Sequence, residues 1–328
     1  MATDEVAKST VGILSLGDMG AGIARVLVAQ GFPVVTNCED RSQDTVERAR
    51  GAKVELVPTD LDLVRRSTVI LSVVPPRDAE ATARRVADAL LRDPGRREPV
   101  YFVDLNAVSP STCRQMAAMF TAAQVPVRFV DGCILGPPPR RLATGSDDGA
   151  DAAWERPSIP VSGPHDLSTL VADGRRLAAA LKLRVVSPRV GDASGLKMCF
   201  AAINKGFVAI ATQSFATAHR LGVAHELRRE MAGLMPAQLA AAERGVPGMP
   251  PKAYRWVHEM HEIAATMSHE GPWGRELFDG VAAVYQAVAD NEVLGRERIG
   301  RRERGGTLED VAALMAGPGG PEASSERQ

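Results

Sequence analysis

The sequence predicts an α/β domain with a largely parallel sheet, followed by an all-α domain. From residue 10 to about residue 190, short runs of Val, Ile and Leu alternate with amphipathic stretches, which is the rhythm of successive βαβ units. The apolar runs lack polar alternation, so helices should cover both faces of their sheet. After Asp192 the chain becomes Ala-rich with almost no strand signal. We therefore predict an α/β domain at 9–190, a helical domain at 191–315 and a disordered tail at 316–328.

The elements of the first domain can be placed in order along the chain. Ser109 as N-cap with Pro110 at the first helical position is an explicit helix start. The segment 136–157 is rich in Pro, Gly and Asp and shows no period, so it should be a mobile surface loop. Strands are expected at 11–16, 32–37, 54–57, 68–76, 99–105, 127–135, 159–163 and 183–187, and helices at 22–30, 43–50, 78–91, after Ser109 and at 167–182.

The second domain should consist of helices alone. The first is a stretch of about thirty residues from Ser194, and further helical patterns run at about 225–244, 251–269 and 273–294. A helix of that length normally needs a partner to cover its apolar face. These helices offer more apolar surface than one small domain can bury, so we expect a homodimer.

Charge and cysteine content exclude several classes of protein. Lys plus Arg number 39 and Asp plus Glu 40, for a formal net charge of −1, so no global field attracts nucleic acid or a membrane. The four cysteines are scattered and lack a C-x-x-C pair, which favours reduced thiols in a cytoplasmic protein over a disulfide framework or a metal site. No apolar run is long enough to span a membrane, and the first residues do not resemble a signal peptide. We expect a soluble protein.

The turn between the first strand and the first helix carries a dinucleotide-binding pattern. It reads Ser15-Leu16-Gly17-Asp18-Met19-Gly20, the position of the G-x-G-x-x-G fingerprint of a Rossmann domain, with the first glycine replaced. Gly17 would let the backbone approach a pyrophosphate, and Gly20 would permit close packing of helix on strand. Ser15 can form the tight turn if its dihedral angles stay in a region open to L-residues. We expect all six residues to contact the cofactor.

The end of the second strand should recognise the adenine ribose of the cofactor. Asn37 is followed by Glu39 and Asp40, whose carboxylates could accept hydrogen bonds from a ribose diol and favour NAD. Arg41 with Ser42 could instead bind a 2'-phosphate and favour NADP, although Ser42 could also cap the next helix. We favour NADPH because an arginine suits bidentate phosphate binding. NAD stays possible.

At this point the chain resembles the β-hydroxyacid dehydrogenase superfamily, which includes 6-phosphogluconate and 3-hydroxyisobutyrate dehydrogenases and the imine reductases. Four segments between residues 10 and 300 carry the resemblance: the cofactor turn, Val73-Val74-Pro75, the run Val103 to Pro110, and Gly191 to Lys197. More narrowly, the chain resembles a poorly characterised subgroup with a divergent C-terminal domain. The resemblance implies that Val74, Pro75 and Asn106 lie against the cofactor.

The resemblance also nominates catalytic and substrate residues. Lys197 matches the lysine that touches the reacting oxygen in hydroxyacid members, where a lysine can donate or accept the proton. The family's asparagine four residues later is Ala201 here, and Asn204 at i+7 returns to the same helix face. Asn106 replaces a small hydroxyl residue and should face the nicotinamide or the substrate. We therefore name Lys197, Asn204 and Asn106 as catalytic candidates.

Two further regions are substrate candidates. The family's substrate loop reads Asp131-Gly132-Cys133-Ile134-Leu135-Gly136-Pro137 here, with Leu135 in place of a carboxylate-binding serine. Losing polar anchors argues against a small hydroxy acid in the usual pose. Trp256 and Met260 share a helix face that could line the cleft or a dimer groove, although core packing is equally compatible with the pattern. The nearby histidines have the wrong spacing for an H-E-x-x-H zinc site, so no metal is expected.

Together these residues predict an NAD(P)H-dependent oxidoreductase that transfers a hydride between the nicotinamide and a small carbonyl or hydroxyl substrate. An imine or iminium reductase is one alternative, because the carboxylate anchors are lost. A non-catalytic, NADP-binding regulatory protein is the other. The sequence names no substrate and does not fix the direction of the reaction.

Overall fold

The computed structural model describes residues 9–39, 42–142, 154–170 and 173–317. The chain divides into two compact units, residues 1–197 and 198–328. The boundary between the two units lies inside the long helix α8 (Asp192–Arg220). It falls seven residues beyond the boundary expected from the sequence. The expected disordered tail lies almost wholly outside the described residues.

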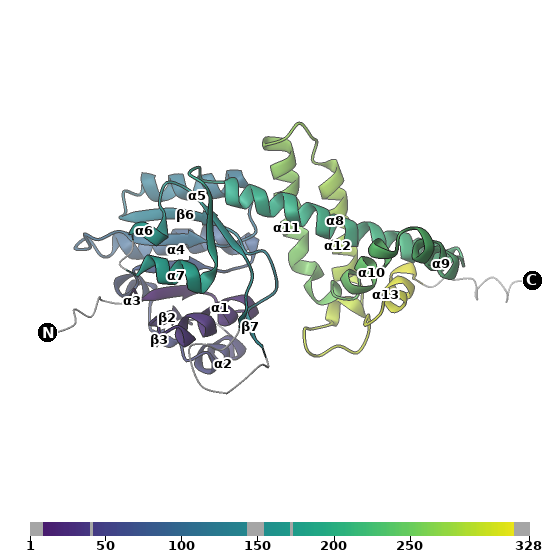
Figure 1. Ribbon diagram of the computed structural model, residues 1–328, viewed down its shortest axis with the longest axis horizontal. Coiled ribbons are helices and arrows are strands. Elements are labelled where there is room, and N and C mark those ends of the chain that lie inside the picture. The colour runs from purple at the N-terminus through teal and green to yellow at the C-terminus, as the bar shows by residue number, and fades with distance from the viewer. Residues whose placement is uncertain (1–8, 40–41, 143–153, 171–172, 318–328) are drawn as a thin grey trace, which may run out of the picture. The chain divides into compact units, whose positions relative to one another are not determined.

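The first unit is built on an eight-stranded sheet with the order β10-β9-β6-β5-β4-β1-β2-β3 (Figure 1). All its neighbouring pairs are parallel except β6 with β9, which are antiparallel. The largely parallel Rossmann-type sheet is thus confirmed. Its strands are β1 (Val11–Leu14), β2 (Val34–Asn37), β3 (Glu55–Val57), β4 (Val69–Ser72), β5 (Val100–Asp104), β6 (Val127–Gly132), β9 (Ile159–Ser162) and β10 (Leu183–Ser187).

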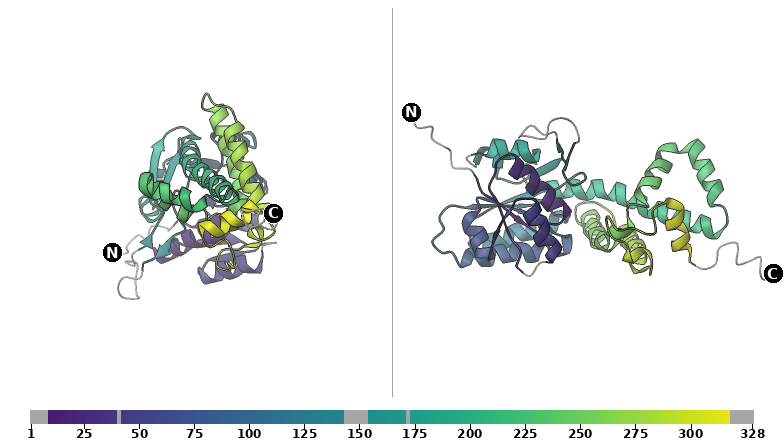
Figure 2. Two further views of the ribbon diagram at one scale, coloured as in Figure 1. Left: turned by 90° about the vertical axis from the view of Figure 1, so that its right-hand side faces the viewer. Right: turned by 90° about the horizontal axis from the view of Figure 1, so that it is seen from below.

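Helices cover both faces of this sheet (Figure 2). Successive strand residues point to opposite faces: Val69 and Leu71 join the core under α1 and α7, whereas Ile70 joins the core under α3, α4 and α5. Burial on both sides explains the absence of polar alternation in the sequence. The helices are α1 (Asp18–Ala29), α2 (Gln43–Gly51), α3 (Asp60–Arg66), α4 (Ala79–Leu91), α5 (Pro110–Ala122), α6 (Leu167–Leu170) and α7 (Gly174–Leu181).

Two predictions for the first unit need correction. Instead of the single helix expected at 167–182, the described residues form two helices, α6 and α7. Gly174, at the start of α7, packs so closely on the carbonyl group of Leu167 that a Cβ would overlap it. The expected loop at 136–157 contains a short antiparallel pair at its described ends, β7 (Arg140–Arg141) with β8 (Trp154–Glu155). Residues 143–153 lie outside the described part.

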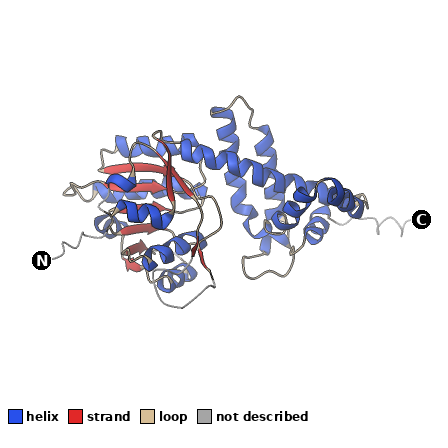
Figure 3. Ribbon diagram, in the orientation of Figure 1, coloured by secondary structure: helices blue, strands red, loops and turns tan. Residues whose placement is uncertain are grey.

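The second unit consists of helices, and every named strand of the described chain precedes residue 188 (Figure 3). This confirms an all-α region after the sheet. The helix expected at 225–244 is interrupted at Pro236, because proline lacks the N–H and cannot continue the preceding helix. After α8 the helices are α9 (Ala224–Leu234), α10 (Pro236–Gly245), α11 (Ala253–His269), α12 (Glu276–Asp290) and α13 (Leu308–Ala316).

No helix of the described residues is both long enough and apolar enough to cross a bilayer.

Candidate functional site

The glycine turn presents an open helix N-terminus at the carboxyl end of β1. Gly17 is the N-cap of α1 with extended dihedral angles, and a Cβ added there would meet nothing within 4 Å. At Gly20, by contrast, a Cβ would overlap the carbonyl oxygen of Ser15. Gly20 therefore allows the close packing that the sequence predicted, and Gly17 leaves room for a group above the first turn of α1. Free backbone N–H groups at such a terminus are suited to a phosphate.

Ser15 departs from the expected backbone geometry. Its φ is 72°, in the left-handed region, where the sequence analysis required an angle open to ordinary L-residues. Glycine normally occupies such positions because a Cβ costs about 1 kcal/mol there. Ser15 thus takes the backbone role of the missing first glycine at a cost in strain. Leu16 is fully buried, so its side chain cannot touch a cofactor.

The ribose end of the site includes an arginine that the sequence analysis missed. Arg48 on α2 donates from Nε to the carbonyl oxygen of Leu16 at 2.8 Å and from Nη2 to Thr45 Oγ1 at 3.1 Å. Its half-buried guanidinium therefore lies between the glycine turn and the start of α2. A cation there suits a phosphate. Sequence position alone does not indicate this contact, because it depends on how α2 packs against the glycine turn.

The other residues expected at the ribose end are placed as follows. Asn37 is buried; its amide donates to Asp60 Oδ1 at 2.9 Å and accepts from the Glu39 N–H at 2.8 Å. It therefore holds the loop rather than presenting a free amide. Ser42 is the N-cap of α2, but its hydroxyl bonds to Thr45 Oγ1 and not to the backbone. Asp40 and Arg41 lie outside the described residues.

Asn106 does not face open space, contrary to the prediction. It is 3% exposed, and its Oδ1 accepts from the Val74 N–H at 2.7 Å. Its Nδ2 donates to Ser72 Oγ at 2.9 Å and to the Asp104 carboxylate. The amide is used within the protein, so Asn106 positions the Val74-Pro75 loop at the carboxyl end of β4. We expect no direct role for it in the chemical step.

Asp131 anchors the first turn of α8 instead of facing a substrate. It is fully buried at the end of β6. Its Oδ2 accepts from Ser162 Oγ at 2.7 Å and from the N–H groups of Gly191 at 2.9 Å, Ala193 at 3.0 Å and Ser194 at 3.2 Å. Its Oδ1 accepts from Ser194 Oγ at 2.6 Å and Cys113 Sγ at 3.2 Å. A carboxylate at a helix N-terminus satisfies unpaired N–H groups and favours the helix dipole.

A second buried carboxyl group lies beside this anchor. Asp104 pairs in register with Asp131 across β5 and β6 and has no exposed surface. Burial, followed by repulsion from Asp131, raises the pKa of Asp104 to about 8. Asp104 is therefore protonated at neutral pH, while both oxygens of Asp131 accept hydrogen bonds from the surrounding donors.

Lys197 extends from the anchored end of α8 toward the β6 loop. Its Nζ donates to the carbonyl oxygen of Ile134 at 2.8 Å, and the residue is half-buried. An ammonium has three N–H groups, so this bond fixes the group without exhausting its donors. The β6 segment thus holds the helix through Asp131 and the lysine through Ile134. This geometry fits a group that gives or takes a proton.

The rest of the predicted substrate loop is largely inaccessible. Gly132 and Cys133 are buried, and burial raises the pKa of the Cys133 thiol to about 12. Leu135 is half-buried and pairs through its backbone with Ser158. Of the four substrate candidates in this loop, Asp131, Gly132, Cys133 and Leu135, Leu135 is therefore the one with an accessible side chain.

The predicted residues of the second unit fall into separate environments. Asn204 on α8 is exposed, whereas Met260 on α11 is completely buried and belongs to the core, which corrects its assignment to substrate. Trp256 stacks edge-on against Tyr285 with ring centroids 5.2 Å apart, and Lys205 Nζ lies 4.7 Å from its ring centroid. Tyr285 is fully buried, whereas Trp256 is half-buried and packs on its ring from the edge of the core.

Comparison with known proteins supports the same fold. One family described as "NADP oxidoreductase coenzyme F420-dependent" matches residues 10–94, and a domain of unknown function (DUF1932) matches residues 218–288. A curated relative, an uncharacterized 28.5 kDa protein of Methanothermus fervidus, is 25% identical over 221 residues, or 65% of this chain and 74% of that protein.

Two solved structures show the likeness over most of the chain. The 3-hydroxyisobutyrate dehydrogenase of Mycobacterium tuberculosis with L-serine is 17% identical, with a TM-score of 0.62 over 94% of this chain and 98% of that one. The chain has the fold of this dehydrogenase. An imine reductase variant of Myxococcus stipitatus with NAD+ is also 17% identical, with a TM-score of 0.50 over 94% and 98%.

These findings confirm the predicted resemblance to hydroxyacid dehydrogenases and imine reductases at the level of the fold. The matched family and the solved structures are oxidoreductases, so they support the general class of NAD(P)-dependent oxidoreductases. A sequence identity of 17% shows a shared fold and does not identify the substrate of this chain.

Proposed function

We propose that this protein is an NADPH-preferring oxidoreductase that transfers a hydride between the nicotinamide and a small carbonyl or hydroxyl substrate. The observation that carries the proposal is the open N-terminus of α1, where Gly17 leaves space and Gly20 closes the helix onto the strand. Its N–H groups would hold the pyrophosphate. Arg48, with Arg41 and Ser42, would hold the 2'-phosphate, and Val74 and Pro75 would border the nicotinamide.

Lys197 would manage the proton in this reaction. The nicotinamide supplies or accepts the hydride when bound. During reduction, the Lys197 ammonium would donate a proton to the substrate oxygen as the carbon receives the hydride, and solvent would then reprotonate the amine. The bond from Nζ to the carbonyl oxygen of Ile134 would keep the ammonium oriented between turnovers.

An imine or iminium substrate is the second candidate, because the apolar, half-buried Leu135 stands where the family has a carboxylate-binding serine. The same lysine could serve that reaction by protonating nitrogen. A non-catalytic, NADP-binding regulatory protein is the remaining alternative. It would bind the cofactor without turnover of any carbonyl, alcohol or imine.

A variant of Gly17 tests the cofactor site directly. Gly17 has a φ of −65°, open space and the N-cap position, so Gly17→Asp should leave the melting temperature of the cofactor-free protein unchanged or slightly raised. The added carboxylate should repel the pyrophosphate and abolish the rise in melting temperature with NADPH. For wild type, NADPH at 100 times its dissociation constant should stabilise the fold by about 2.7 kcal/mol.

Equal stabilisation of wild type and Gly17→Asp by NADPH would refute the site. Oxidation of NADPH with cyclic imines, keto acids, simple aldehydes and coenzyme F420 would then separate the candidate reactions. Coenzyme F420 is included because the matched family is described by it.

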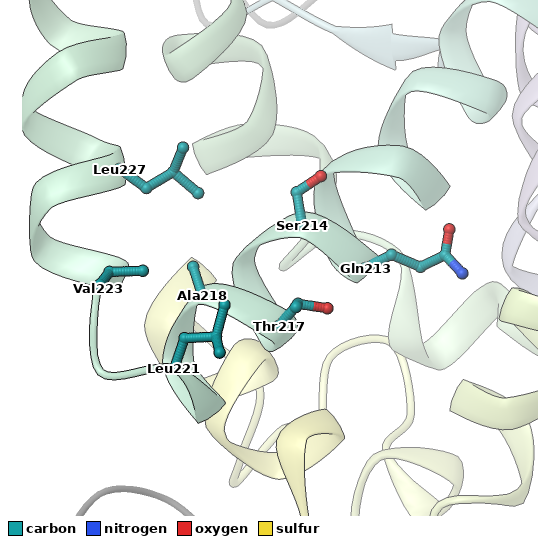
Figure 4. Close-up of a pocket in the computed structure, with 7 residues that line it drawn as sticks. All are labelled: Gln213, Ser214, Thr217, Ala218, Leu221, Val223 and Leu227. Atoms are coloured by element: carbon teal, nitrogen blue, oxygen red, sulfur yellow. The ribbon is translucent and has the colours of Figure 1, made fainter.

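We further propose that the protein is a cytoplasmic homodimer and that the partner copy covers α9. In the isolated chain α9 has no buried residue. Its last residue, Leu234, is 79% exposed, and Leu221, which precedes the helix, is 70% exposed. Leu221 lines an open apolar hollow at the corner of α8 and α9 (Figure 4). A helix without a buried face needs a covering surface. A monomeric mass by light scattering at micromolar concentration would contradict the dimer.

A further inference from the structure

A second hollow in the first unit, the basic hollow, lies between the C-terminal ends of α1 and α2 and the β7–β8 pair. Its cavity volume is about 490 Å³, and its lining includes Arg25, Val28, Lys53, Arg140, Arg141 and Trp154. Small residues keep it open, because Ala29 and Ala52 line it and a Cβ at Gly51 would meet nothing within 4 Å. Every lining residue belongs to the first unit.

Four basic side chains line this hollow, and none of the described residues that line it is acidic. Arg25 lies on α1 and Lys53 follows α2. Both are exposed, and within the described ranges neither makes a side-chain hydrogen bond or an ion pair. Arg140 is paired with Glu155, and Arg141 completes the set. The basic hollow therefore carries an excess of positive charge.

The two helices do not need these cations as caps. Backbone N–H groups just beyond each helix already bond to its last carbonyl groups: those of Val26 and Val28 in α1, at 3.0 and 2.9 Å, and those of Arg48 and Arg50 in α2, at 3.0 and 2.9 Å. Carbonyl groups satisfied in this way leave the neighbouring cations available to another acceptor.

The basic hollow also has an apolar wall. Trp154 is half-buried and lies directly opposite Arg141 in the antiparallel β7–β8 pair, so the two side chains emerge on the same face. Val28 and Ala29 continue the apolar surface along α1. An indole ring beside several cations suits a ligand that joins a planar apolar body to an anionic group.

The arrangement of the cations favours a phosphate monoester over a carboxylate. Arg25, Lys53 and Arg141 come from three separate segments, namely α1, the residue after α2, and β7. A phosphate monoester carries a charge of about −1.5 to −2 at neutral pH and three acceptor oxygens, so it can meet donors from several directions. A carboxylate has only two oxygens.

We propose that the basic hollow binds a small phosphate monoester with a planar apolar body. The phosphate bonds to Arg25 and Lys53, and the apolar body packs against Trp154 and Val28. This second ligand site is separate from the proposed cofactor site, which lies at the N-terminal ends of the same two helices.

Calorimetric titration with three probes tests the proposal. Phenyl phosphate carries both ring and anion, phenol keeps the ring alone, and inorganic phosphate keeps the anion alone. Each is titrated into NADPH-loaded protein at low ionic strength, because salt screens exposed charges. Wild type should bind phenyl phosphate at least about fivefold more tightly than either fragment. Equal binding of phenyl phosphate and phenol would overturn the anion site, and equal binding of phenyl phosphate and inorganic phosphate would overturn the apolar wall.

Two variants that remove a charge assign the binding to the basic hollow. Arg25→Met and Lys53→Met should each weaken the binding of phenyl phosphate by about three- to fivefold and leave that of phenol unchanged. Arg50→Met is the matched control, because Arg50 is an exposed arginine in the last turn of α2 that does not line the hollow. It should bind phenyl phosphate as wild type does. An affinity that survives both charge-removing variants, or that falls equally in Arg50→Met, would overturn the assignment.

Gly17→Asp separates the basic hollow from the cofactor site. Gly17 begins α1, whereas the hollow lies at the other end of that helix. Without NADPH, Gly17→Asp should therefore bind phenyl phosphate with the affinity of NADPH-loaded wild type. Loss of phenyl phosphate binding in this variant would place the anion in the glycine turn and overturn the second site.

Discussion

Replacing Asp131 by asparagine should destabilise the first unit by about 2 to 4 kcal/mol. An amide keeps one oxygen, which would sit at the Oδ2 position and still accept from Ser162, Gly191, Ala193 and Ser194. Each of these four bonds changes from a charged to a neutral acceptor and weakens by about 1 kcal/mol. Relief of the buried charge offsets part of the loss.

The assay is thermal unfolding followed by circular dichroism at pH 6. A loss of about 2 to 4 kcal/mol should lower the melting temperature of the first unit by at least about 4 °C. Asp104→Asn is the matched control, because Asp104 is its buried neighbour and is protonated at that pH. Asp104 accepts hydrogen bonds from Asn106, whereas Asp131 accepts six, most of them from the start of α8, so Asp104→Asn should change the melting temperature much less. Equal shifts in the two variants would refute the anchoring role of Asp131.

Three further predictions concern the same region. With a folded pKa of about 8 against a usual 3.8, Asp104 should make the free energy of unfolding fall as the pH rises from about 4 to 8, and Asp104→Asn should flatten that slope in denaturant melts. Lys197→Met should lower kcat by about 10²- to 10⁴-fold with NADPH affinity nearly intact, and unchanged turnover would remove Lys197 from the mechanism. Arg48→Gln should weaken NADPH binding more than NADH binding in calorimetric titrations; equal weakening would mean that Arg48 does not contact the 2'-phosphate.

Local chemistry made much of the fold predictable from the sequence. The Ser109 hydroxyl accepts from the Thr112 N–H at 3.2 Å, so the predicted N-cap is confirmed. Gly20 packs closely, as expected. Its neighbour in that contact is the carbonyl group of Ser15, only five residues away in the sequence. The break at Pro236 was also readable, since a proline within a helical pattern ends the helix before it.

The contacts of side chains whose partners lie far away in the sequence were not predictable. Asp131 finds its donors about sixty residues along the chain, at the start of α8. Met260 and Trp256 share a helix face in the sequence, but whether that face meets the core depends on how α11 packs. Periodicity defines a face without naming what covers it.

Polar residues gather at the carboxyl ends of β4, β5 and β6. They show that fewer residues of a sequence motif can contact the substrate directly than the motif suggests. Ser72, Asp104, Asn106 and Asp131 are all buried, and a buried polar group must be hydrogen-bonded to avoid a cost of about 1 to 3 kcal/mol. Their hydrogen bonds run to one another, to Val74 and to the start of α8. They therefore set the positions of a loop and a helix, and Lys197, which that helix carries outward from its anchored turn, keeps donors for a reacting atom.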